Sequence, residues 1–174
     1  MTSLLHPLKR LLAPGLLLGG VTACSNIDCP LDNVVLMQCN FYSSETQSPL
    51  KLADSLSVRL AANGLTVVNT STGVEKFLVP LKDSGERDTL LLHFSNLQGQ
   101  QATDTLVVAH QPQPHFESLD CPPSFFHTLT AVWATSHPLS EMPLTVDSVS
   151  LSRSIVNYDD IENIRIYLRT TSGR

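Results

Sequence analysis

The sequence has few charged residues and no cluster of Lys and Arg. Only 16% of its 174 residues are charged, and the formal net charge is −5. Nucleic-acid recognition needs a concentrated excess of basic side chains, so no nucleic-acid partner is expected. The 42% share of hydrophobic residues excludes a disordered chain. No unbroken 18-residue apolar stretch follows the N-terminal region, which excludes a polytopic membrane protein.

Common catalytic and metal-binding motifs are missing as well. There is no Gly-x-Ser-x-Gly, Ser-x-x-Lys or His-Glu-x-x-His motif. His110 and His115 match no metal-ligand spacing and are interpreted as surface-loop residues, while His93 and His137 have no suggestive neighbours. Asp159, Asp160 and Glu162 could offer oxygens to Ca²⁺, but they lack the Gly and the regular carboxylate spacing of a calcium-binding loop, so they are interpreted as a solvated turn. We therefore expect no metal, no cofactor and no enzymatic activity.

The N-terminus has the features of a bacterial lipoprotein signal peptide. Lys9 and Arg10 are basic, and residues 11–21 form an apolar segment too short to span a bilayer. Val21-Thr22-Ala23-Cys24 resembles the lipobox, in which an aliphatic residue, a small residue and Ala or Gly precede the acylated Cys. We predict cleavage before Cys24 and acylation of its thiolate. The alternative is an ordinary signal peptide, with Cys24 in a disulfide.

These features divide the chain into a signal peptide (1–23), an acylated N-terminus and tether (24–32) and one domain (33–174). Two acyl chains on Cys24, and usually a third, would attach the protein to the lipid bilayer permanently. Ser25 rather than Asp follows Cys24. By resemblance to the sorting rule of enterobacterial lipoproteins, this favours the outer membrane, with the domain facing the periplasm or the exterior.

Beyond the tether, apolar and polar residues alternate in short runs separated by turn residues, as is typical of strands with one buried face. Asn63-Gly64 is expected to close a hairpin with a two-residue loop, since both positions tolerate positive φ. The Pro-rich segment 112–123 is expected to cross between two sheets. The predicted strands are 34–42, 56–61, 65–69, 74–81, 89–94, 105–110, 126–135, 146–156 and 164–169.

The alternation also predicts which side chains face inward. Within 56–60, three apolar residues share one face and Arg59 lies on the other. His127 shares its parity with Leu129 and Trp133, so we expect Trp133 to be buried and His127 to be a hydrogen-bonded residue at the edge of the core. About nine strands with no covering helix predict an all-β antiparallel β-sandwich of Ig-like or related Greek-key type, with an open β-barrel as the alternative.

Three cysteines lie outside the anchor. Cys29 and Cys121 each precede Pro in loop-like surroundings, whereas Cys39 shares parity with Met37 and Phe41 inside a predicted strand. We therefore predict a Cys29–Cys121 disulfide, with Cys39 as a buried free thiol.

Several short motifs extend from the N-terminus to the last predicted strand. They are the lipobox, Cys29-Pro30, Asp88-Thr89-Leu90, Asp104-Thr105-Leu106, Cys121-Pro122, Asp147-Ser148-Val149 and Ile164-Arg165-Ile166-Tyr167-Leu168. Together they resemble an uncharacterised family of Bacteroidota lipoproteins, a domain of unknown function, over nearly the whole mature chain. The resemblance implies a small exported β-rich lipoprotein. It assigns no catalytic or binding residue, because none is established for the family.

A triplet of Asp, Ser or Thr, and an aliphatic residue occurs four times. It resembles the O-glycosylation acceptor of Bacteroidota, and the candidate hydroxyls belong to Ser55, Thr89, Thr105 and Ser148. The alternative is that Asp ends a turn before a strand.

Three functions from different classes remain. The first is a non-enzymatic envelope lipoprotein that acts as an interaction or accessory module, with another envelope protein or a glycan as partner. The second is a carbohydrate-binding module, which should expose aromatic platforms and is disfavoured if Trp133 faces inward. The third is an envelope hydrolase, which requires a His and a carboxylate to converge near a Ser or a water in one pocket.

Overall fold

The computed structural model describes Cys29 and residues 34–171. The predicted signal peptide and the predicted acylation site Cys24 lie outside the described residues. No helix capable of crossing a membrane occurs in residues 29 and 34–171.

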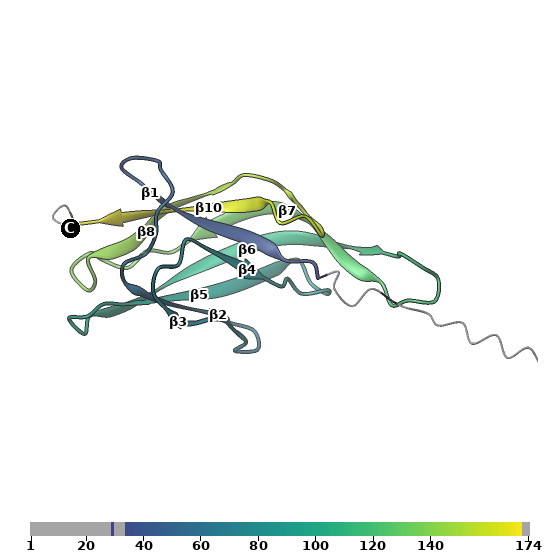
Figure 1. Ribbon diagram of the computed structural model, residues 1–174, viewed down its shortest axis with the longest axis horizontal. Coiled ribbons are helices and arrows are strands. Elements are labelled where there is room, and N and C mark those ends of the chain that lie inside the picture. The colour runs from purple at the N-terminus through teal and green to yellow at the C-terminus, as the bar shows by residue number, and fades with distance from the viewer. Residues whose placement is uncertain (1–28, 30–33, 172–174) are drawn as a thin grey trace, which may run out of the picture.

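The described residues form an all-β sandwich of two sheets (Figure 1). Its strands are β1 (Met37–Ser43), β2 (Ser55–Leu60), β3 (Thr66–Ser71), β4 (Lys76–Val79), β5 (Arg87–Ser95), β6 (Gln101–His115), β7 (Ser124–Ala134), β8 (Leu144–Leu151), β9 (Ile155–Val156) and β10 (Glu162–Thr170). The four-stranded sheet has the order β4-β1-β10-β8, and the six-stranded sheet has the order β3-β2-β5-β6-β7-β9. Strands β1 and β10 pair in parallel, and the other neighbours pair antiparallel. The sandwich is confirmed, in place of the open-barrel alternative.

The core lies between the sheets and follows the alternation in the sequence. Every second residue of β5 is buried, from Asp88 to Phe94, and β6 continues the pattern from Ala102 to His110. The three apolar residues predicted to face inward on β2 are buried and Arg59 is exposed, and β4 and β10 show the same alternation of buried and less buried residues. Because every second residue is buried on strands of both sheets, their side chains form one continuous core although the chain has few aromatic residues.

The predicted strand 146–156 is two strands that belong to different sheets. Strand β8 pairs with β10, whereas β9 pairs with β7. Asn163 stabilises the break between them, since its side-chain Nδ2 donates to the carbonyls of Arg153 and Ile155 at 3.2 and 2.9 Å. The buried Asn163 amide thus provides hydrogen bonds to carbonyl groups at the point where the chain leaves one sheet and enters the other.

The Pro-rich segment does not cross between sheets. Strand β6 continues through Pro112 and Pro114 to His115 and forms a hairpin with β7 in the same sheet. Strand β5 ends its pairing with β6 at the Arg87–Ala109 pair, so both prolines lie where β6 has become an edge strand on that side. Pro is tolerated there because no ladder hydrogen bond is lost. The hairpin projects from one end of the long axis, opposite the end of β10 (Figure 1).

A β-bulge in β7 makes the prediction for Trp133 wrong. His110 pairs with Leu129 and Ala109 pairs with Ala131, so Thr130 is an extra residue on β7. The bulge reverses the parity of the strand after Leu129. His127 is therefore buried as predicted, whereas Trp133 faces outward and is 40% exposed.

The hairpin between β2 and β3 forms where Asn63-Gly64 predicts it, with Gly64 at φ +69°. Its loop is longer than the predicted two residues. The Leu60 N–H donates to the Leu65 carbonyl at 2.9 Å, which leaves four residues in the loop.

The predicted disulfide is present. Cys29 and Cys121 are bonded with their Cα atoms 5.6 Å apart, and Cys39 is a free, buried thiol on β1. Because Cys121 lies in the β6–β7 loop, the bridge attaches the N-terminal segment to the projecting end of the six-stranded sheet.

Candidate functional site

A chain of three titratable side chains lies on the inner face of the six-stranded sheet. Nε2 of His110 lies 3.0 Å from Oδ2 of Asp88, and Nδ1 of His110 lies 3.1 Å from Nδ1 of His127. Asp88 and His110 are each 1% exposed, and His127 is 3% exposed. Lys82 adds a backbone N–H at 2.9 Å from Oδ2 of Asp88 and its ammonium at 3.4 Å from Oδ1.

The partners decide where the protons lie. The Asp88 carboxylate can only accept, so Nε2 of His110 carries a proton and donates. With a neutral His110, Nδ1 of that ring is an acceptor, and Nδ1 of His127 is the donor. Nε2 of His127, at the end of this row of three side chains, is then unprotonated and carries a lone pair. Burial, assisted by the neighbouring His110, lowers the pKa of His127 to about 4, against the opposing effect of Asp83 and Asp88.

His127 lines a pocket of about 270 Å³ together with Asp83 and Ser124. These residue types are the ones that the hydrolase hypothesis requires in one pocket. Among the described residues, however, no hydrogen bond joins the Ser124 hydroxyl to His127 or Asp83. The pocket therefore brings an imidazole, a carboxylate and a Ser together, with the Ser hydroxyl hydrogen-bonded to neither of the other two in the described structure.

The interpretation of His110 and His115 as surface-loop residues is wrong, because both lie on β6. His110 lies on β6 and is buried, since it continues the inward alternation of Asp104, Leu106 and Val108. This alternation was the signal in the sequence, but the two prolines that follow led to the surface-loop interpretation. His115, at the end of β6, stacks on Phe126 with ring centroids 4.2 Å apart.

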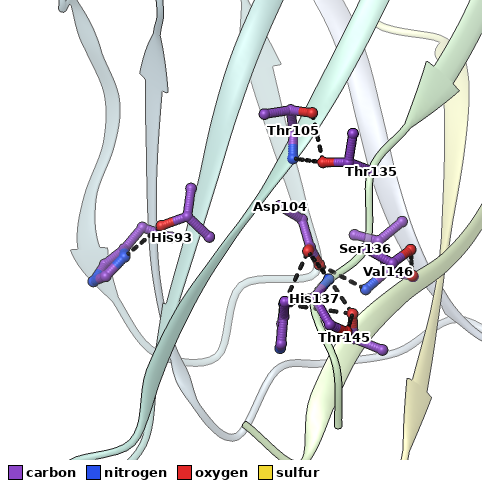
Figure 2. Close-up of polar contacts among 9 residues, drawn as sticks. His93, Asp104, Thr105, Thr135, Ser136, His137, Thr145 and Val146 are labelled. Atoms are coloured by element: carbon purple, nitrogen blue, oxygen red, sulfur yellow. Dashed lines mark hydrogen bonds and ion pairs between the residues drawn. The ribbon is translucent and has the colours of Figure 1, made fainter. Parts of the chain in front are cut away.

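A second buried carboxylate lies further along the same face of β6 and organises the β7–β8 connection (Figure 2). Oδ1 of Asp104 accepts from the backbone N–H of His137 at 2.6 Å and lies 2.9 Å from its Nδ1. Oδ2 of Asp104 accepts from the Val146 N–H at 2.9 Å and from the Thr145 hydroxyl at 3.3 Å. Asp104 and Thr145 are fully buried, and His137 is 9% exposed. With both oxygens satisfied inside the fold, this cluster is structural.

The outer face of the six-stranded sheet carries a third group of side chains. Arg87 lies over the Trp133 ring, with its Cζ atom 5.1 Å from the ring centroid. Further along the same face, a hollow of about 340 Å³ is lined by Ser57, Arg59, Thr70, Leu91, His93 and Thr103. Nδ1 of His93 lies 3.0 Å from the Thr103 hydroxyl, apart from the Asp104 cluster on the other face (Figure 2).

The four candidate glycosylation hydroxyls differ in accessibility. Ser148 is exposed, whereas Ser55, Thr89 and Thr105 are half-buried. The Thr105 hydroxyl also lies 2.7 Å from that of Thr135. Two of the triplets contain Asp88 and Asp104, whose buried hydrogen bonds give those carboxylates a role within the fold. Modification of at least one site stays a prediction, and Ser148 is the most accessible candidate.

No group of three or more His, Cys, Asp or Glu side chains in the described part of the chain could hold a metal ion.

A family model for a family of unknown function, DUF6452, matches residues 55–168, which is more than half of the chain. The match runs from β2 to β10 and includes both buried Asp–His clusters and the outer face around Trp133. No curated protein and no solved structure matches the chain. The chain belongs to the family of unknown function DUF6452.

Proposed function

We propose that this protein is a lipid-anchored envelope lipoprotein of the Bacteroidota type, attached to the outer membrane through Cys24, and that it works by binding rather than catalysis. The observation that carries the proposal is the Cys29–Cys121 disulfide. Disulfides persist in oxidising compartments outside the cytoplasm, which agrees with export through the lipobox at Cys24.

The position of the disulfide also suits a short tether. Cys29 follows Cys24 by five residues, which span about 18 Å at full extension. The bridge to Cys121 would therefore hold the β6–β7 end of the sandwich close to the membrane surface. The opposite end and the outer faces of both sheets would remain available to a partner.

The binding role is supported by how the buried acidic and basic groups are used. The Asp104 carboxylate makes four hydrogen-bond contacts, all with groups inside the fold. The Asp88 carboxylate is hydrogen-bonded to the buried His110. A catalytic carboxylate or imidazole has to reach a substrate. Of these two clusters, His127 is the member that lines the pocket with Asp83 and Ser124.

The anchor is tested by replacing Cys24. In cells that process lipoproteins, Cys24→Ala should move the protein from the membrane pellet to the soluble fraction and abolish labelling with radioactive palmitate. Ser25→Ala, which leaves the lipobox intact, is the matched control and should still pellet. Pelleting of Cys24→Ala at the level of the unaltered chain would overturn the proposed anchor.

A hydrolase is the second candidate function, favoured by the pocket that Asp83, Ser124 and His127 share. Activity-based probes for serine hydrolases, together with a panel of ester and amide substrates, test it. Turnover that is lost in both Ser124→Ala and His127→Asn would replace the binding role with catalysis. Turnover that survives both variants would contradict a catalytic role for this pocket.

A further inference from the structure

Three basic side chains in the described part of this acidic protein form no ion pair with a described carboxylate. Of its eight Lys and Arg residues, five are paired, and those without such a pair are Arg59, Lys76 and Arg87. Arg59 and Arg87 lie on the outer face of the six-stranded sheet, and Lys76 lies on the other sheet. The outer face therefore holds two positive charges that the described structure does not neutralise.

The strand registers show that these residues share one face. Arg59 pairs with Leu91, and Arg87, Leu91 and His93 have the same parity on β5. Trp133 pairs with Val107, which in turn pairs with Thr89 on that face. On this stretch of β2, β5, β6 and β7, no outward-facing position holds Asp or Glu. These positions hold Arg, His, Ser, Thr, Gln, Trp and small or aliphatic residues.

The hollow beside these charges is polar and partly enclosed. Ser57 faces outward and yet is only 6% exposed, because the side chains around it form the walls. Hydroxyl groups of Ser57, Thr70 and Thr103 line the hollow together with the His93 imidazole. Thr70 adopts φ +39°, a left-handed conformation that is strained for a β-branched residue. Such strain is often retained where a side chain must be held toward a ligand.

We propose that this outer face, from Trp133 through Arg87 to the hollow at Arg59 and His93, is a binding site for an acidic oligosaccharide that carries carboxylates. The proposal rests on the binding role and names its ligand class. Arg59 and Arg87 would bind carboxylates, for which a planar guanidinium is well suited. The exposed part of the Trp133 ring offers an amphipathic surface for the C–H face of a sugar ring. The hydroxyls and His93 would bind sugar hydroxyls.

The dimensions favour a chain of sugars over a single one. Trp133 on β7 and Arg59 on β2 are separated by three strand spacings, about 14 Å across the sheet. A short oligosaccharide spans this distance. Nucleic acid suits the face less well, because two arginines neutralise too few phosphates on a chain of net charge −5. An acidic peptide that adds a strand needs a free edge, whereas Arg59 and Arg87 lie on β2 and β5, each of which pairs with a neighbouring strand on both sides.

Fluorescence of the single tryptophan provides the test, because Trp133 lies in the site. The full chain, purified in detergent, is titrated with a galacturonic acid tetramer and with its methyl ester, which keeps the sugar rings but removes the negative charges and adds a methyl group to each carboxyl. We expect the acidic tetramer to change the Trp133 emission with saturation and the ester to bind about tenfold or more weakly. A sulfated oligosaccharide and oligoglutamate are further probes. Equal affinity for the ester, or tighter binding of oligoglutamate, would overturn the proposal.

Variants show whether the named residues form the site. Arg59→Gln and Arg87→Gln should each weaken binding of the tetramer about tenfold, measured by calorimetry, and Trp133→Ala should do the same. Lys76→Gln is the matched control, since it removes another unpaired charge on the other sheet. All four side chains are exposed, so circular dichroism should report unchanged folding. Binding that Arg59→Gln and Trp133→Ala leave unaltered would locate the ligand elsewhere.

The test of oligosaccharide binding and the test of the membrane anchor can fail independently of each other. Loss of membrane attachment in Cys24→Ala leaves the outer face intact. Absence of any acidic-oligosaccharide binding by the correctly acylated protein would overturn the ligand assignment alone.

Discussion

The Nδ1 atoms of His110 and His127 lie 3.1 Å apart inside the sandwich, where each ring is almost inaccessible to solvent. Two imidazoles in such contact share one proton, because one Nδ1 must donate and the other must accept. The Asp88 carboxylate fixes the proton on Nε2 of His110, so protonation of His127 would add a proton at its Nε2 and leave a positively charged imidazolium in a buried site. Protonation of His127 is therefore coupled to the integrity of the fold.

We predict that stability falls in acid because of His127. Its pKa is about 4 in the folded protein and near 6.5 in the unfolded chain. Between these values the unfolded chain binds the proton and the folded protein does not, so the free energy of unfolding decreases as the pH falls from 6.5 to 4. The contribution is fully present above pH 6.5, and the loss is on the order of 2 kcal/mol. Urea unfolding at several pH values measures it.

His127→Asn is the control for this pH dependence. Its amide can still donate toward His110 but does not titrate in this range. The variant should be less stable at neutral pH, and its stability should fall less steeply between pH 6.5 and 4. His110, His137 and the nearby Asp83 and Asp88 remain in both proteins, so the difference in slope isolates residue 127. Identical slopes would contradict the assignment.

The sequence predicted the sandwich because alternation depends on one local rule, that every second side chain of a strand faces the core. The same rule predicts that His110 faces the core, because His110 follows the inward-facing Val108 by two residues. It failed at Trp133, because the extra residue at Thr130 reverses the parity and a bulge has no clear sequence signal. The Asp88–His110–His127 contacts also depend on the register between three strands, which a single sequence does not determine.

Asp104 should be among the most sensitive positions of the fold. In Asp104→Ala, the buried N–H groups of His137 and Val146 lose their acceptor, and the Thr145 hydroxyl loses one partner. We expect the free energy of unfolding to fall by about 3 to 5 kcal/mol. Thr145→Val removes a single hydroxyl and should cost about 1 kcal/mol. Chemical denaturation compares the two, and equal losses would contradict the central role of Asp104.

The Cys39 thiol should be inert in the folded protein. It is fully buried between the sheets, and burial raises its pKa far above the usual value, so almost no thiolate forms. Iodoacetamide should leave Cys39 unmodified in native protein and alkylate it fully in denaturant, as peptide mass spectrometry would show. Rapid alkylation without denaturant would contradict the burial of this side chain.

Reduction of the Cys29–Cys121 bridge should destabilise the sandwich strongly while leaving its strands in place. The bridge closes a loop of 92 residues, for which chain entropy predicts a contribution of about 4 kcal/mol to the free energy of unfolding. Both cysteines lie outside the strands, so the reduced protein should keep its β-sheet circular dichroism under native conditions. Urea unfolding with and without reductant measures the effect, and the double variant Cys29→Ser, Cys121→Ser should match the reduced protein and no longer respond to reductant. An unaltered midpoint on reduction would contradict the prediction, because a bridge over so long a loop must restrict the unfolded chain.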